Sequence, residues 1–308
     1  MRSRTGDTTE MAAARTITQR WVAGHLPPRP ERAHKGDFGR LLVVAGSIDY
    51  PGAALLCALG AMRAGVGMAR IAAAESVVAR LAGAVPELTW LTLDEEAPGL
   101  IAPGGWRRVA TEAADHDAVV VGPGLGRQPA TQRRTRQLIA GLEMPVVVDA
   151  DGLNALADGA RWWQGIRGSL VLTPHPGEFS RLTGNDAPDG GDDEARGQAA
   201  IDAALRWDQV VVLKGAHTVI AEPGGESLRS GVATAALATA GSGDVLAGVI
   251  GAFLAGGAAP FDAAACGVAV HGAAGLLAAG RVGTAGVMAR DIADLLPEAI
   301  GQLRGERG

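Results

Sequence analysis

Short apolar runs rich in valine and leucine alternate along this chain with longer stretches of helical character. Continuous apolar strands are typical of parallel sheets that helices cover on both faces. The sequence therefore predicts an α/β fold, a three-layer α/β/α sandwich with a largely parallel central sheet. Strands are expected at residues 40–46, 68–74, 117–122, 145–150, 168–173 and 208–215. Helices are expected at residues 51–65, 75–82, 129–140, 152–157, 177–182, 193–206, 243–257, 262–280 and 288–303. Two further runs, 217–222 and 226–231, flank a Pro-Gly-Gly turn and predict a hairpin.

Composition limits the classes of partner. The 308 residues are 47% apolar, so the chain can bury a core. Its net charge of -5 argues against nucleic acid as an electrostatic partner. Cys57 and Cys266 stand in apolar surroundings without metal-ligand spacing, which indicates free thiols in a reducing, cytoplasmic setting.

Two apolar segments, 245–260 and 263–280, resemble membrane spans by their lack of charge. They consist largely of alanine and glycine, which favours helices packed closely in a soluble core, so no membrane association is expected. Residues 1–33 are interpreted as a leader or short helix, and residues 34–308 as one domain.

Ligands of parallel α/β sheets bind at the carboxyl ends of the strands, and the unusual residues of this sequence gather there. Gly241-Ser242-Gly243-Asp244 precedes a long apolar helix. Glycines at a helix start expose backbone N–H groups to an anion, and the helix dipole favours negative charge there. A capped helix would show the same glycines. Ser242 and Gly243 are therefore a candidate anion hole, and Asp244 is a candidate base that takes a proton from an attacking hydroxyl.

The segment from Lys214 through Gly215, Ala216 and His217 to Thr218 lies between two predicted strands. The chain has only two lysines, Lys35 and Lys214, so a lysine in this position is notable. The segment is interpreted either as a solvated turn or as a loop that contacts the phosphate or ribose of a nucleotide.

Three further strand ends carry candidate ligand contacts. Gly124 lies in Gly-Pro-Gly-Leu-Gly, which matches the dinucleotide-binding fingerprint only loosely. A glycine-rich wall against a flat ligand is the favoured interpretation. Asp149 and Asp151 follow a strongly apolar strand and could orient hydrated Mg²⁺, or cap a turn. His175 stands between two prolines and is interpreted as a ligand contact or as a buried, hydrogen-bonded histidine.

Neither lysine stands in a Gly-Lys-Ser/Thr context, which excludes a P-loop kinase.

Taken in order, these motifs resemble those of the bacterial ADP-dependent NAD(P)H-hydrate dehydratases, members of the ribokinase-like superfamily. The resemblance runs from about residue 34 to about residue 300 and rests most on PHPGE, KGAHT and GSGD. It implies that the S epimer of hydrated NADH or NADPH is dehydrated with ADP, giving NAD(P)H, AMP and phosphate, with Mg²⁺ as cofactor. The 33 residues before the domain are too few for the epimerase domain of fused relatives, so a stand-alone dehydratase is expected. Family habit implies a homotetramer.

The resemblance also implies contacts. The hydrate would lie against Ala53, Gly124, His175 and Asp244, and the nucleotide would be held by residues 214–218 and Gly243. Two alternatives stay open. A ribokinase-like kinase for a vitamin alcohol would use the same Gly-Ser-Gly-Asp motif and stop at the phosphorylated product. A catalytically silent nucleotide-binding protein would show no turnover at all.

Overall fold

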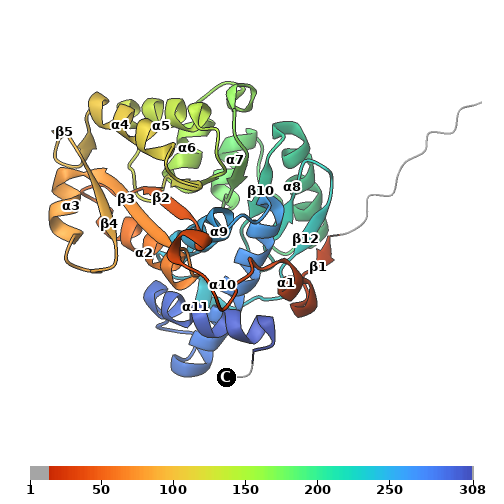
Figure 1. Ribbon diagram of the computed structural model, residues 1–308. Helices are drawn as coiled ribbons and strands as arrows, with labels where there is room; N and C mark the ends of the chain where they lie inside the picture. Colours follow the sequence, from red (N-terminus) through yellow and green to blue (C-terminus); the bar gives the residue numbers. More distant parts are fainter. Residues whose placement is uncertain (1–13, 307–308) are drawn as a thin grey trace, which may run out of the picture.

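A central sheet of ten strands, covered by helices on both faces, organises residues 14–306, the part of the chain that the computed structural model describes (Figure 1). The strand order is β1-β12-β11-β10-β9-β8-β7-β2-β3-β4. All pairs from β10 to β4 are parallel, while β11 and β12 form the antiparallel hairpin expected from the sequence. The strands are β1 (Arg15–Thr16), β2 (Arg40–Val44), β3 (Met68–Ala74), β4 (Thr89–Leu93), β7 (Ala118–Val121), β8 (Val146–Val148), β9 (Leu170–Leu172), β10 (Val210–Leu213), β11 (Val219–Ala221) and β12 (Ser227–Arg229).

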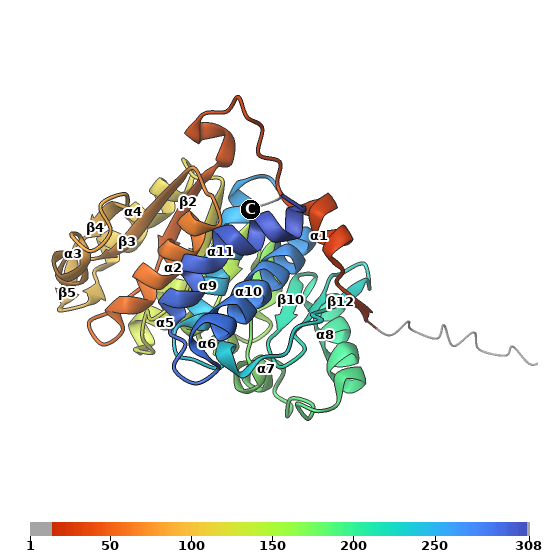
Figure 2. The same ribbon diagram turned by 90° about the horizontal axis from the view of Figure 1, so that it is seen from below.

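Two helical layers enclose this sheet. In Figure 1, α4 to α8 lie along one face, and Figure 2 shows α2, α9, α10 and α11 side by side on the other. The helices are α1 (Gln19–His25), α2 (Pro51–Arg63), α3 (Glu75–Leu81), α4 (Pro103–Ala113), α5 (Pro129–Gly141), α6 (Asp151–Ala157), α7 (Pro176–Thr183), α8 (Asp193–Trp207), α9 (Ser242–Ala255), α10 (Pro260–Val282) and α11 (Ala289–Arg304). The three-layer α/β/α sandwich predicted from the sequence is confirmed.

The central strands are buried on both sides because helices cover both faces. Every residue of β7 and β8 has no exposed surface, which explains their runs of valine. Small residues let the covering helices approach closely. A Cβ on Gly248 of α9 would lie 1.9 Å from the Cys57 carbonyl oxygen of α2, so only glycine permits this packing.

The sequence did not predict β1, β4, the small sheet of β5 (Glu95–Ala97) and β6 (Leu100–Ile101), or α4. β4 is the outermost strand of the sheet and alternates buried and exposed residues, so it lacks the continuous apolar run that marks the inner strands. α4 begins with Pro-Gly-Gly, a sequence typical of loops.

The described part of the N-terminal segment packs on the body of the fold. Arg15 and Thr16 pair in parallel with β12, and α1 contacts α10 and α11. Residues 1–13 lie outside the described part, and the division of the chain at residue 33 stays a prediction.

Helix α10 is long and apolar enough to cross a membrane by length and composition alone. Within the fold, 67% of its apolar window is buried, and it packs against α9 and α11. These contacts are those of a core helix, as the alanine and glycine content of the segment predicts.

Candidate active site

The carboxyl ends of β7, β8, β9 and β10 lie beside one another and face the start of α9. This arrangement follows from parallel pairing, which brings consecutive strand ends to one edge of the sheet. Asp149 follows β8, Thr173 and His175 follow β9, and Lys214 follows β10. The sheet thus gathers side chains that are up to 65 positions apart in sequence.

Lys214 joins two of these strand ends. Its ammonium donates a hydrogen bond to Asp149 Oδ1 at 2.8 Å, and Thr173 Oγ1 donates to the same oxygen at 2.7 Å. Asp149 is 2% exposed, so its carboxylate is held by both partners away from water. Burial disfavours the charge of Lys214, but Asp149 and then Glu178 outweigh burial and raise its pKa. Lys214 is therefore a fixed positive charge at the edge of the sheet.

The start of α9 lies directly against this pair. Gly241 caps the helix in a left-handed conformation, with φ of 86°. A Cβ on Gly243 would lie 3.4 Å from Lys214 Nζ and 3.9 Å from Asp149 Oδ2. The N–H groups of the first helical turn and the lysine ammonium therefore lie close together, although the N–H of Ser242 already donates to the Thr239 carbonyl oxygen at 3.2 Å. Positive charge thus lies beside Ser242 and Gly243, and their role as an anion hole stays a prediction.

Asp244 lies in the first turn of α9 and has an unusual pKa. Burial, followed by repulsion from Asp149, raises the pKa of Asp244 to about 7, although Lys214 partly counteracts this. A carboxyl group that ionises near neutral pH can both accept and release a proton under physiological conditions. Asp244 therefore has the property that a general base needs.

His175 begins α7 and is fixed by the side chain of Glu178. The Glu178 carboxylate accepts a hydrogen bond from His175 N at 2.9 Å, and its other oxygen lies 3.4 Å from His175 Nε2. His175 Nδ1 in turn accepts from Gly177 N at 3.0 Å. Burial, and then the charge of Lys214, lower the pKa of His175, so the ring is neutral at physiological pH. Half of the imidazole is exposed and available to a ligand.

Gly124 and Ala53 face each other across the ends of β7 and α2. Gly124 has φ of 63°, and a Cβ there would lie 2.9 Å from Ala53 Cβ and 2.8 Å from Tyr50 Cβ. The loop after β7 is held by Asp151, whose Oδ2 accepts from Gly126 N at 2.9 Å. Asp151 thus anchors the glycine-rich loop, and the small residues at positions 53 and 124 keep this contact close.

The segment from Gly215 to Thr218 forms a tight turn between β10 and β11. Thr218 Oγ1 donates to the Gly215 carbonyl at 3.1 Å, and His217 Nδ1 lies 3.2 Å from the carbonyl oxygen of Ser230. Ala216 is exposed at the tip. The turn begins at Lys214, so it extends outward from the candidate anion hole.

Three residues near the site were missed from the sequence. Glu178 lies within the PHPGE motif, but its residue type alone does not predict its contact with His175. His271 of α10 is buried and its Nε2 lies 3.1 Å from Ser242 Oγ, while Arg196 of α8 is buried behind the Gly215 turn. The latter two lie in helices far from the motifs in sequence, and nothing in their local pattern marks them.

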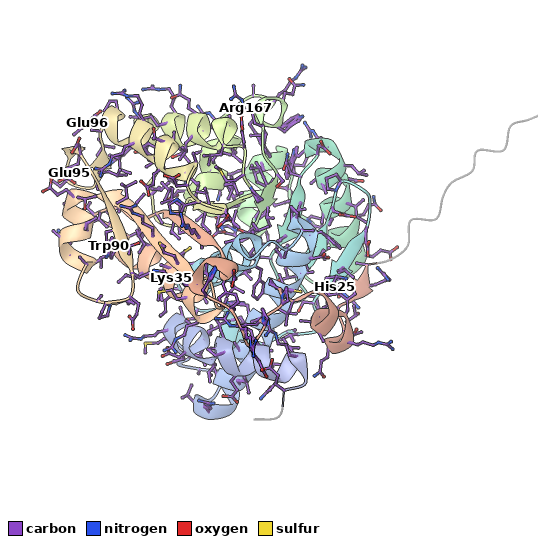
Figure 3. The ribbon with its side chains drawn as sticks, in the orientation of Figure 1. His25, Lys35, Trp90, Glu95, Glu96 and Arg167 are labelled. Atoms are coloured by element: carbon purple, nitrogen blue, oxygen red, sulfur yellow. The ribbon has the colours of Figure 1, made fainter. Side chains whose placement is uncertain are left out.

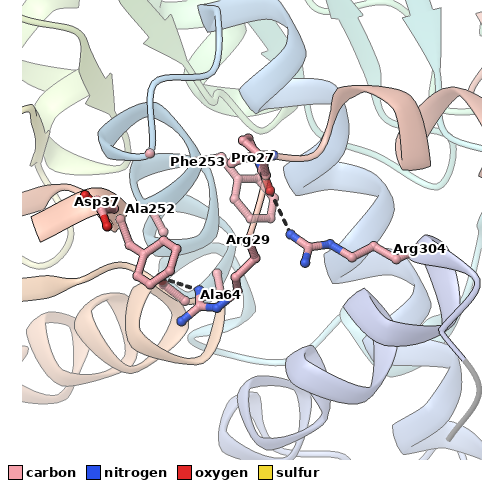
Figure 4. A pocket seen from close by; sticks show the side chains of 11 residues that line it. Pro27, Arg29, Asp37, Ala64, Ala252, Phe253 and Arg304 are labelled. Carbon is pink, nitrogen blue, oxygen red and sulfur yellow. Dashed lines mark hydrogen bonds between the residues drawn. The ribbon is translucent and has the colours of Figure 1, made fainter. Parts of the chain in front are cut away.

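The second lysine, Lys35, lies elsewhere. It is labelled in Figure 3 and belongs to a short 3-10 helix, Lys35–Phe38. Because this helix precedes β2, it lies at the amino ends of the parallel strands, opposite to the carboxyl ends where the site lies. A cavity of about 30 Å³ near this helix is lined by Pro27, Arg29, Phe38 and Arg304, among others (Figure 4). Its volume holds one or two water molecules and excludes a nucleotide.

Among residues 14–306, no group of three or more histidine, cysteine or acidic side chains is arranged to hold a metal ion. Asp149 Oδ1 is occupied by Lys214 and Thr173, and both oxygens of Asp151 accept hydrogen bonds, from Gly126 and Asn154. These carboxylates therefore fit Mg²⁺ only as a minor part of its coordination. Substrate phosphates and water would provide most of the ligands, and one or two carboxylates the rest.

Comparison with known proteins decides the family. The family model described as NAD(P)H-hydrate dehydratase matches residues 41–298. The chain belongs to the NAD(P)H-hydrate dehydratase family. It is 34% identical to the ADP-dependent (S)-NAD(P)H-hydrate dehydratase of Bacillus subtilis over 91% of this chain and 95% of that protein. This family member also matches the crystal structure of a Bacillus subtilis ADP/ATP-dependent NAD(P)H-hydrate dehydratase, with a TM-score of 0.79 over 94% of this chain and 99% of that chain. The ribokinase-like fold predicted from the sequence is confirmed.

This NAD(P)H-hydrate dehydratase family member is also similar to longer proteins. It is 40% identical to the bifunctional NAD(P)H-hydrate repair enzyme Nnr of Moorella thermoacetica over 95% of this chain and 55% of that protein. The chain thus spans about half the length of the bifunctional relatives that it matches.

Proposed function

We propose that the protein dehydrates the S epimer of hydrated NADH or NADPH, using ADP and releasing AMP and phosphate. The observation that carries this proposal is Asp244, a carboxyl group with a pKa of about 7 at the glycine-rich start of α9, beside Lys214. A base and an anion site side by side suit phosphoryl transfer to a hydroxyl group. The relatives named above supply the substrate class.

Asp244 removes the proton of the C6 hydroxyl while that oxygen attacks the terminal phosphoryl group of ADP, and AMP leaves. The start of α9 at Ser242 and Gly243 and the ammonium of Lys214 stabilise the charge on the transferring group, with the Gly243 N–H as the backbone donor, since the Ser242 N–H donates to Thr239 O. Phosphate then leaves C6, helped by the lone pair of the ring nitrogen. Loss of a proton from C5 forms the C5–C6 double bond, so the net change is removal of water at the expense of ADP.

The remaining candidate residues bind and orient the reactants in this proposal. Ala53, Gly124 and the neutral ring of His175 contact the hydrate, and residues 214–218 with Gly243 contact the nucleotide. Mg²⁺ supplies charge neutralisation for the nucleotide phosphates, and Asp149 and Asp151 would hold it through water. We also propose that the protein is cytoplasmic and a homotetramer. The two buried free cysteines support a reducing compartment, and the exposed Leu276 and Val282 on α10 support contacts between subunits. Light scattering tests the oligomeric state.

The test is incubation of the protein with the separated S hydrate, ADP and Mg²⁺. We expect recovery of dihydronicotinamide absorbance together with equal release of AMP and phosphate. The R hydrate is the matched control and should not react, and ATP in place of ADP compares the two nucleotides. Nucleotide consumption without phosphate release would instead show the ribokinase-like kinase. Absence of turnover with either nucleotide would reject both enzymes.

A further inference from the structure

Arg196 is a buried cation directly behind the segment Lys214–Thr218. It lies in the first turns of α8 and is 1% exposed. Its Nη2 donates to the carbonyl oxygens of Leu213 and Lys214, each at 3.2 Å. Asp193, three residues before Arg196 in the same helix, forms its ion pair with Arg229 instead, at 2.7 Å. The guanidinium is therefore directed to backbone groups at the end of β10.

This placement is costly for the fold. Burial lowers the pKa of Arg196, with Asp193 opposing the effect. Within the described residues, Arg196 Nε is buried with no hydrogen-bond partner. A buried charge with incomplete hydrogen bonding destabilises a protein relative to an apolar side chain of similar size. A methionine would fill the same space without this cost, so packing alone does not explain an arginine here.

The two hydrogen bonds determine where the next N–H groups point. In a trans peptide the C=O and N–H groups point in opposite directions. The bond at Leu213 O directs Lys214 N–H toward β9, where it donates to Pro174 O at 2.9 Å. The bond at Lys214 O directs Gly215 N–H away from Arg196, where its described partner is Thr218 Oγ1 at 3.4 Å. That distance is long for a hydrogen bond, which leaves the Gly215 N–H available to an incoming acceptor.

Gly215 is shaped to accept the guanidinium. A Cβ at this position would lie 2.2 Å from Arg196 Nη2 and 2.5 Å from Nη1. Any larger residue at 215 requires the guanidinium to move away from the turn, which weakens its contacts with the Leu213 and Lys214 carbonyls. Arg196 and Gly215 therefore depend on each other. Because Gly215 has no side chain, the guanidinium can lie directly against the backbone of the turn.

From these contacts we infer that Arg196 is a positioning residue for nucleotide binding, which holds the Lys214–Thr218 turn so that Gly215 N–H and the charge behind it face a phosphate or ribose oxygen of the nucleoside diphosphate. The inference rests on the proposed function for the identity of the nucleotide. Arg196 acts through the backbone of the turn and through its electrostatic potential.

The test compares Arg196→Met, Arg196→Lys and the control Arg229→Met. Calorimetry with ADP and Mg²⁺ measures nucleotide affinity, and hydrate turnover measures KM for each substrate. We expect Arg196→Met to weaken ADP binding and raise KM for ADP about tenfold or more, the loss typical of hydrogen bonds from a charged group, while KM for the hydrate changes less than about twofold. Arg196→Lys should recover part of the affinity, since lysine keeps the charge and lacks the planar fork. Arg229→Met removes a neighbouring ion pair and should leave ADP affinity unchanged.

A double-mutant cycle with Gly215→Ala sharpens the comparison. If both changes act by removing the guanidinium from the turn, the double variant should bind ADP about as weakly as either single variant. If Arg196→Met does not fold, Arg196→Lys and Gly215→Ala carry the test alone. Unchanged ADP affinity in the folded variants, even with a lowered melting temperature, would overturn the inference. If the wild type binds ADP without dehydrating the hydrate, the proposed function fails while the calorimetric test still decides the role of Arg196.

Discussion

At the scale of single residues, Asp244 is the group on which the proposed chemistry depends. Asn keeps the size and hydrogen-bonding shape of the side chain and removes its ability to accept a proton. We expect Asp244→Asn to lower kcat by about 10²- to 10⁴-fold, the usual contribution of a general base. ADP affinity should stay within a few-fold, since the turn and the helix start remain. Steady-state kinetics with the S hydrate and calorimetry with ADP check both parts, and near-normal turnover would remove Asp244 from the role of base.

The protonation of Asp244 also predicts a pH profile. The base is active when ionised, and its pKa is about 7 because of burial and the nearby Asp149. Under limiting substrate, kcat/KM should therefore rise with pH and level off above about pH 7, since this parameter reports the free enzyme. A rate that is flat between pH 6 and pH 8 would argue against this assignment.

The same shift predicts a stability change of definite sign. The folded-state pKa of Asp244 is raised, so ionising it costs free energy in the folded protein, and this cost grows as pH rises from the ordinary range of an aspartate to about 7. Asp244→Asn should therefore stabilise the protein against urea at pH 8 and change little at pH 4. A variant that is less stable than the wild type at pH 8 would contradict this.

At the scale of elements, the start of α9 depends on Gly241. Its φ of 86° disfavours other residues, and a Cβ would lie 2.4 Å from Leu56 Cδ1. Gly257, just beyond the other end of the helix, has φ of 87° with no atom within 4 Å of its Cβ position. Gly257→Ala should cost about 1–2 kcal/mol for the left-handed conformation, and Gly241→Ala about 1–3 kcal/mol more for the contact. Urea unfolding measures the difference, and equal losses would show that the contact is tolerated.

The motif-bearing elements could be predicted from sequence because their signals are local. Valine runs mark β7, β8 and β10, and the glycines before α9 mark a helix start. The edge strand β4 and α4 could not be predicted, because one is half exposed and the other begins as a loop does. Likewise, Arg196 and His271 reach the site only through tertiary packing, since each projects from a helix that other elements place there. Sequence spacing contains no trace of such contacts.

At the scale of the whole molecule, the described part of the N-terminal segment contacts elements that are far apart in the sequence. β1 extends the sheet beyond β12, and Arg304 of α11 donates to Pro27 O at 2.7 Å. Arg29 donates to Gly65 O at 2.8 Å and lies over the Phe38 ring, beside the small cavity of Figure 4. Because these contacts involve α11 and the loop before β3, we expect the segment to unfold together with the sheet.

A pair of leucine truncations tests this cooperativity. Leu26, at the end of α1, is 8% exposed, whereas Leu205, on the outer side of α8, is 51% exposed. Leu26→Ala should lower the free energy of unfolding by about 2–4 kcal/mol, because it leaves a cavity against the body, and Leu205→Ala by less than about 1 kcal/mol. Both variants should unfold in a single transition with the wild-type dependence on urea concentration, and their hydrate turnover should be unchanged. If Leu26→Ala costs no more than Leu205→Ala, or if it produces a separate early transition, then the segment unfolds independently of the sheet and the contacts of Arg29 and Arg304 contribute little to the stability of the domain.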